Sequence, residues 1–144
     1  MAGVSVSLIG SFRQHYEEVV LAAAEFESLG VVVRSPTISS IINPGNGYVR
    51  FASDLPGSSD ELIQAVTIER LLASDFIYVV APGGYIGRET CYELGRVHQR
   101  GMPVFYSERP GDLHIDVPEE LVTPVRRLAV QMLECHRGTR SARE

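Results

Sequence analysis

The chain has 144 residues, a formal net charge of −5 at pH 7 and 44% hydrophobic residues, which is typical of one globular domain. All 13 basic residues are arginine, so a lysine Schiff base and the lysine of a phosphate-binding P-loop are excluded. The acidic balance argues against a nucleic acid polymer as partner, whereas a single nucleotide needs only one or two arginines.

Membrane, redox and metal functions have no sequence signal. No apolar run reaches the roughly 18 residues of a membrane span, and the first ten residues do not resemble a signal peptide. We therefore expect a cytoplasmic protein with no membrane partner. The two cysteines form no CxxC motif, and the four histidines are not spaced like metal ligands, so we predict neither a metal nor another cofactor.

The first half of the chain predicts two strands around a helix. Residues 4–9 form an apolar stretch that ends at Gly10, and residues 14–29 have helical periodicity up to the stop at Gly30. The β-branched residues 31–33 predict a short buried strand. Residues 36–60 are rich in turn signals, and they form either a lid over a ligand or a plain surface loop.

The second half continues the alternation of helices and strands. Residues 110–116 are a candidate fifth strand. We predict one domain over residues 1–136, followed by a disordered tail over 137–144. The predicted helices cover residues 61–74, 88–100 and 118–135, and the predicted strands cover 76–81 and 104–106.

This order predicts an α/β fold, specifically a single-domain flavodoxin- or Rossmann-like three-layer sandwich with a mostly parallel sheet of four or five strands. Such sheets bind ligands beyond the carboxyl ends of their strands, where the strand order reverses. Two of the predicted strand ends carry unusual residues. They are Gly10-Ser11-Phe12-Arg13 and the glycine-rich turn over 82–87.

The second turn leads into a helix with two glutamates on one face. Its glycines bring backbone N–H groups close to a ligand, and a helix start favours anions. Glu89 and Glu93 are four residues apart, and the helix dipole alone explains Glu89. Glu93 in the second turn either pairs with a nearby arginine, Arg96 or Arg100, or projects into a pocket.

Two motifs resemble one enzyme family. An aspartate, an apolar strand and a glycine-containing loop precede Glu93-Leu94-Gly95-Arg96-Val97, and Gly10-Ser11-Phe12-Arg13 follows the first strand. This combination resembles the nucleoside 2-deoxyribosyltransferases and the related 2'-deoxynucleoside 5'-monophosphate N-glycosidases. The matched elements cover about residues 4–108.

The resemblance implies cleavage or transfer at the N-glycosidic bond of a nucleoside or nucleoside 5'-monophosphate. Glu93 would be the nucleophile that attacks the anomeric carbon and forms a covalent glycosyl-enzyme. Water as acceptor makes a hydrolase, and a second base makes a transferase. The resemblance also implies a homodimer or a higher homo-oligomer. The substrate-binding residues implied are Gly10, Ser11, Arg13, Gly84, Tyr85, Ile86, Gly87 and Glu89.

Thr67 stands where this family commonly has an aspartate that assists the leaving base, and Glu89 stands where related sequences often have a small residue. Two alternatives therefore stay open. Pro82-Gly83-Gly84 is similar to the loop of cytokinin-activating phosphoribohydrolases, although the spacing to the glutamate is longer here. Thr67 also suits a non-catalytic nucleotide-binding or sensor module.

Overall fold

The computed structural model describes residues 3–36 and 59–143, with side chains up to residue 138. Within these residues, four parallel strands form one sheet in the order β2-β1-β3-β4. The predicted α/β sandwich is therefore confirmed, while the lid predicted within 36–60 lies almost entirely outside the described residues. The strands are β1 (Ser5–Gly10), β2 (Val32–Ser35), β3 (Phe76–Val80) and β4 (Val104–Tyr106).

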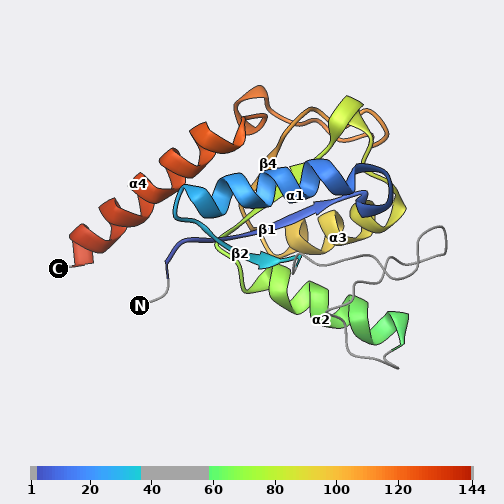
Figure 1. Cartoon of the computed structure of the whole chain (residues 1–144), viewed down its shortest axis with the longest axis horizontal. Helices are drawn as coiled ribbons and strands as arrows, with labels where there is room; N and C mark the ends of the chain where they lie inside the picture. The colour runs from blue at the N-terminus through green and yellow to red at the C-terminus, as the bar shows by residue number, and fades with distance from the viewer. Residues whose placement is uncertain (1–2, 37–58, 144) are drawn as a thin grey trace.

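Helices cover both faces of the sheet. α1 (Phe12–Ser28) packs with α4 (Val125–Arg143), and α2 (Asp60–Leu72) packs with α3 (Arg88–Gln99). Figure 1 shows α1 and α2 on opposite sides of β1 and β2. Alternate residues of β3 and β4 belong to two separate cores, because successive side chains of a strand point to opposite faces. In β3, Tyr78 lies in the core under α1 and α4, and Val79 lies in the core under α2 and α3.

The chain reverses its direction across the sheet between β1 and β3. α1 leads from β1 outward to β2, α2 carries the chain back to β3, and α3 leads on to β4. Because α1 and α3 lie on opposite faces, the segments that follow β1 and β3 diverge at the carboxyl edge of the sheet. This is the switch point at which open α/β sheets bind ligands.

The ends of β1 and β3 approach so closely that residue 10 must be glycine. Gly10 lies opposite Val80 in the ladder. A Cβ atom on Gly10 would stand 2.6 Å from the backbone oxygen of Val80. The close pairing of these two strand ends therefore positions the turn that begins at Ser11.

Two strand predictions need correction. The second strand covers Val32–Ser35 instead of residues 31–33, and Val32 is 47% exposed because β2 is the edge of the sheet. The candidate fifth strand at 110–116 forms turns and bends. The place beside β4 holds a single bridge from Tyr106 to Val122.

The last helix also differs from its prediction. It begins at Val125, directly after Pro124, because a proline is tolerated at a helix start but interrupts a helix interior. A short 3-10 turn, η2 (Glu119–Leu121), precedes it. α4 continues to Arg143, so the backbone of 137–143 is helical where we predicted a disordered tail, and it extends away from the sheet (Figure 1). Across the described ranges, no helix is long and apolar enough to cross a membrane.

Candidate functional site

The turn after β1 brings three predicted site residues together at the switch point. Gly10 ends β1, and Ser11 is the N-cap of α1, where its Oγ accepts a hydrogen bond from the backbone N–H of Gln14 at 3.4 Å. Helix capping alone explains a serine at this position. Arg13 is exposed on the first turn of α1. These residues therefore lie where a ligand at the switch point would meet them.

The turn after β3 is partly packed into the protein. It contains a 3-10 turn, η1 (Pro82–Gly84), and reaches the N-cap of α3 at Gly87. Gly84 is buried with φ +84°, and a Cβ atom there would stand 3.0 Å from the backbone oxygen of Arg109. The Ile86 side chain is fully buried in the core under α2 and α3. Packing therefore accounts for these two residues, whereas the Tyr85 side chain is 39% exposed.

The backbone N–H groups of this turn already have partners. The N–H of Gly83 donates to Oε2 of Glu108 at 3.0 Å. The N–H groups of Ile86 and Gly87 donate to the Asp112 carboxylate at 3.2 Å. The expectation that these groups face a ligand is therefore wrong for this conformation. Carboxylates from the segment after β4 occupy this position because the start of α3 attracts negative charge.

Glu93 is the buried carboxyl group of the region. It is 6% exposed and lies on the inward face of α3 together with Leu94 and Val97. No hydrogen bond or ion pair to its carboxyl group occurs among the described residues. Arg96 instead donates from Nη1 to the Tyr92 hydroxyl at 2.8 Å and lies over the Tyr92 ring. Among the described residues, neither Arg96 nor Arg100 therefore forms an ion pair with Glu93.

Burial controls the protonation of Glu93. It raises the pKa of the Glu93 carboxyl group to about 8, and the negative charge of Glu89 one turn earlier raises this pKa further. At neutral pH the side chain is therefore mostly protonated in the unliganded protein. A buried carboxyl group with a shifted pKa and no protein partner is typical of functional sites.

His15 is a residue of this region that the sequence analysis did not single out. It lies on the first turn of α1, two positions after Arg13. Its Nε2 atom is buried and has no hydrogen-bond partner among the described residues. Its ring meets the Tyr85 ring edge to face, with centroids 5.9 Å apart. No sequence pattern singled out this histidine, because residues two apart on a helix do not share a face.

Tyr85 connects the two sides of the switch point. Its hydroxyl oxygen lies 3.5 Å from the position that a Cβ atom on Gly87 would occupy. Tyr85 thus contacts the N-cap of α3 on one side and His15 of α1 on the other. The predicted residues of both turns consequently belong to one region at the carboxyl edge of the sheet.

Two other motif residues lie away from this region. Asp75 is at the amino end of β3, where its Oδ2 accepts hydrogen bonds from the Ser5 backbone N–H at 2.7 Å and from the Ser5 hydroxyl at 3.2 Å. It therefore holds β1 and β3 together. Thr67 is half-buried within α2, and the nearby Glu61 and Glu69 are exposed. No cluster fit to hold a metal ion exists among the described side chains.

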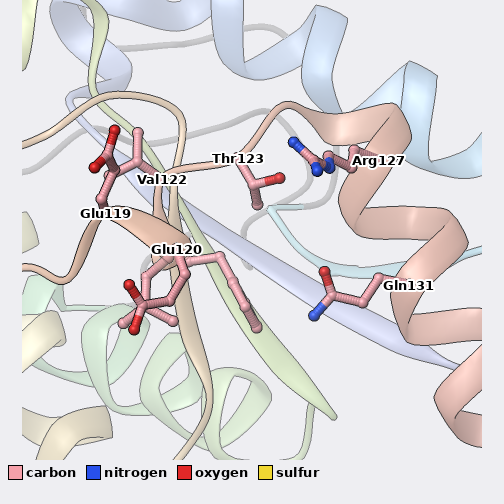
Figure 2. Close-up of a pocket in the computed structure, with 8 residues that line it drawn as sticks. Glu119, Glu120, Val122, Thr123, Arg127 and Gln131 are labelled. Atoms are coloured by element: carbon pink, nitrogen blue, oxygen red, sulfur yellow. The ribbon is translucent and has the colours of Figure 1, made fainter.

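A separate open groove of about 660 Å³ lies beside β4 and α4. Figure 2 shows Glu119 and Glu120 on one side of it, and Arg127 and Gln131 projecting from α4 on the other. None of the predicted site residues lines this groove. Its lining consists of Phe105, Glu119, Glu120, Leu121, Val122, Thr123, Arg127 and Gln131.

Comparison with known proteins supports the fold alone. No protein-family model matches the chain, and no curated protein is significantly similar to it. A solved structure with a similar fold is that of a conserved protein from Enterococcus faecalis V583, with a TM-score of 0.54 and 18% sequence identity. The alignment covers 73% of this chain and 63% of that chain, so the similar region spans less than two thirds of the other protein.

Proposed function

We propose that this protein cleaves or transfers at the N-glycosidic bond of a nucleoside or nucleoside 5'-monophosphate, with Glu93 as the nucleophile. The observation that supports this most directly is the buried Glu93 carboxyl group, which has no partner among the described residues. The proposal includes a cytoplasmic location and a homo-oligomer, as the sequence predicts.

The reaction would proceed in two displacements. A Glu93 carboxylate oxygen bonds to the anomeric carbon while the bond from that carbon to the base nitrogen breaks, and the electron pair leaves with the base. Water or a second base then attacks the same carbon and releases Glu93. Burial weakens the solvation of the Glu93 carboxylate, which strengthens its attraction to the positive charge that develops on the sugar.

The two turns at the switch point suit the two ends of such a substrate. Arg13 on the first turn of α1 offers a guanidinium fork for a 5'-phosphate, and the exposed Tyr85 ring offers an apolar face to the sugar or base. Because Asp112 occupies the N–H groups at the start of α3, the phosphate is assigned to the side of Ser11 and Arg13.

Free-base release from nucleosides and their 5'-monophosphates tests the proposal. We expect the wild-type protein to release base, and Glu93→Gln to reduce the rate by at least about 10³-fold while its circular dichroism is unchanged. Glu134→Gln, at an exposed position on α4, is the matched control and should retain wild-type release. Equal release by Glu93→Gln and wild type would overturn the assignment.

A second candidate is the nucleotide-binding module without turnover. The raised pKa of Glu93, about 8, favours it, because a protonated carboxyl group binds ligands but does not attack carbon. Thermal stabilisation by a nucleotide, with no base release at pH 7 or pH 9, would select this function. The phosphoribohydrolase alternative is checked in the same assay, and hydrolysis confined to ribonucleoside 5'-monophosphates, with no release from nucleosides or 2'-deoxynucleotides, would select it.

A further inference from the structure

We infer that His15 is the proton donor to the departing base. This inference rests on the proposed function, and it assigns a role that neither the motifs nor the resemblance supplied. Cleavage of an N-glycosidic bond leaves an electron pair on the base nitrogen, and protonation of the base makes its departure much easier. A donor is therefore expected on the base side of the anomeric carbon, facing the nucleophile.

The His15 imidazole has an unused hydrogen-bonding atom. Its Nε2 is buried and unpaired among the described residues. Buried polar atoms almost always have a partner, and leaving one unpaired destabilises the protein. A bound ligand that hydrogen bonds to Nε2 would remove this cost. The atom is thus suited to a function that begins when a ligand arrives.

His15 and Glu93 belong to the two helices that begin on either side of the switch point. His15 belongs to the first turn of α1 and Glu93 to the second turn of α3, and these helices begin at the same edge of the sheet but cover opposite faces. Tyr85 contacts both sides, through the His15 ring and through Gly87. A sugar attacked by Glu93 would present its base toward the α1 side.

The acidic residues nearby are less suited to the task. Asp112 and Glu108 already accept hydrogen bonds from the backbone N–H groups of the second turn, so they hold that turn and are not directed at a ligand. Glu89 is exposed on the same helix as Glu93, so it lies on the side of the nucleophile. On α2, Thr67 has no acidic proton.

His15 exchanges one proton with the substrate in each half of the reaction. Imidazolium Nε2 of His15 transfers its proton to a nitrogen of the base as the glycosidic bond breaks, and the neutral base leaves. The imidazole is then neutral and accepts a proton from the incoming water when the glycosyl-enzyme is hydrolysed. The histidine and the glutamate are both restored at the end of one turnover.

Leaving-group dependence tests this assignment. The fastest natural substrate is compared with the 4-nitrophenyl glycoside of the same sugar, because 4-nitrophenolate departs without a proton. The comparison uses kcat/KM, which reports departure of the leaving group and not the later hydrolysis of the glycosyl-enzyme. We expect His15→Gln to lower kcat/KM for release of the natural base by about 10²-fold or more, and kcat/KM for release of 4-nitrophenolate by less than about 10-fold. Glu93→Gln should abolish both, and His136→Gln, at an exposed position on α4, should change neither.

The outcomes separate the two proposals. A His15→Gln variant that slows both substrates equally, or neither, while Glu93→Gln abolishes both, overturns the role of His15 and leaves the proposed function intact. Wild-type protein that releases no base, or a Glu93→Gln variant as active as wild type, overturns the proposed function and the donor role together. Thermal melting of each variant identifies a loss that is due to misfolding. For a His15→Gln variant that does not fold, His15→Asn is measured in its place.

Discussion

Glu89 and Glu93 lie one turn apart on α3, but Glu89 is exposed and Glu93 is 6% exposed. Two identical side chains therefore have different environments. Burial and the neighbouring charge raise the pKa of Glu93 to about 8. Such a carboxyl group makes stability and activity depend on pH in opposite directions, and the first two predictions follow from this relationship.

The stability of the wild-type protein should fall as pH rises, and Glu93→Gln should remove this fall. The pKa of Glu93 is 4.5 when unperturbed and about 8 in the folded protein, so between these values the unfolded chain has lost a proton that the folded chain retains. Stability therefore falls as pH rises through this window, by at most about 5 kcal/mol at about 1.4 kcal/mol per pKa unit. Urea unfolding at pH 5 and pH 8.5 measures the effect.

The comparison uses the difference between variant and wild type, since other groups also titrate. Glu93→Gln should gain stability relative to wild type as pH rises, whereas Glu134→Gln, at an exposed position, should follow wild type. A constant difference between Glu93→Gln and wild type across the pH range would contradict the prediction.

Glu89→Gln should shift the pH dependence of catalysis. With the 4-nitrophenyl glycoside, whose leaving group departs without a proton, kcat/KM of the free enzyme should rise with pH as Glu93 ionises, with a midpoint near pH 8. Because Glu89 adds to the raised pKa of Glu93, its neutralisation should move this midpoint to lower pH, by the smaller part of the total shift since burial is the larger cause. An unchanged or higher midpoint in the pH–rate profile argues against this coupling.

Gly10→Ala should destabilise the fold. The new Cβ atom would lie 2.6 Å from the backbone oxygen of Val80, and both strands are held by the ladder, so we expect a loss of about 2 kcal/mol or more. Gly95 provides the matched control, since it is exposed in α3 with open space around it. Gly95→Ala should gain roughly 0.5–1 kcal/mol by helix propensity. Urea denaturation measures both, and a Gly10→Ala variant as stable as wild type would show that the strand ends separate easily.

Asp112→Asn should make the Cys91 thiol easier to ionise. Burial raises the pKa of the Cys91 thiol, and the Asp112 charge adds to this effect. In a Cys135→Ser background, where only Cys91 reacts, the pH midpoint of its reaction with a disulfide reagent should fall, while the rate at high pH stays the same. Asp116→Asn, at an exposed position, is the control. A higher rate at high pH would instead indicate that the turn has loosened.

Local sequence patterns predicted most of the elements. The observed ranges of β3 and α3 agree with the predicted ranges within one residue at each end. β3 consists of five buried apolar residues, and α3 begins directly after Gly87 and ends at Gln99. The prediction that residues 31–33 form a buried strand was wrong, because an apolar β-branched run does not reveal whether its strand is central or at an edge. The predicted start of α4 was wrong because residues 118–124 include two prolines. The helix begins after the second of them, Pro124, and not at Pro118.

The sequence by itself determined the α/β alternation and the two turns at the ends of β1 and β3, because these depend on residue types and spacing within short segments. The role of Glu93 as nucleophile is what the family resemblance implies, and it stays a proposal. The tertiary structure decided what each group contacts. It placed Asp112 on the N–H groups of the second turn and left the Nε2 atom of His15 buried without a described partner. These contacts join segments from different strands and helices or depend on burial, and both arise only when the chain packs, so no local pattern encodes them.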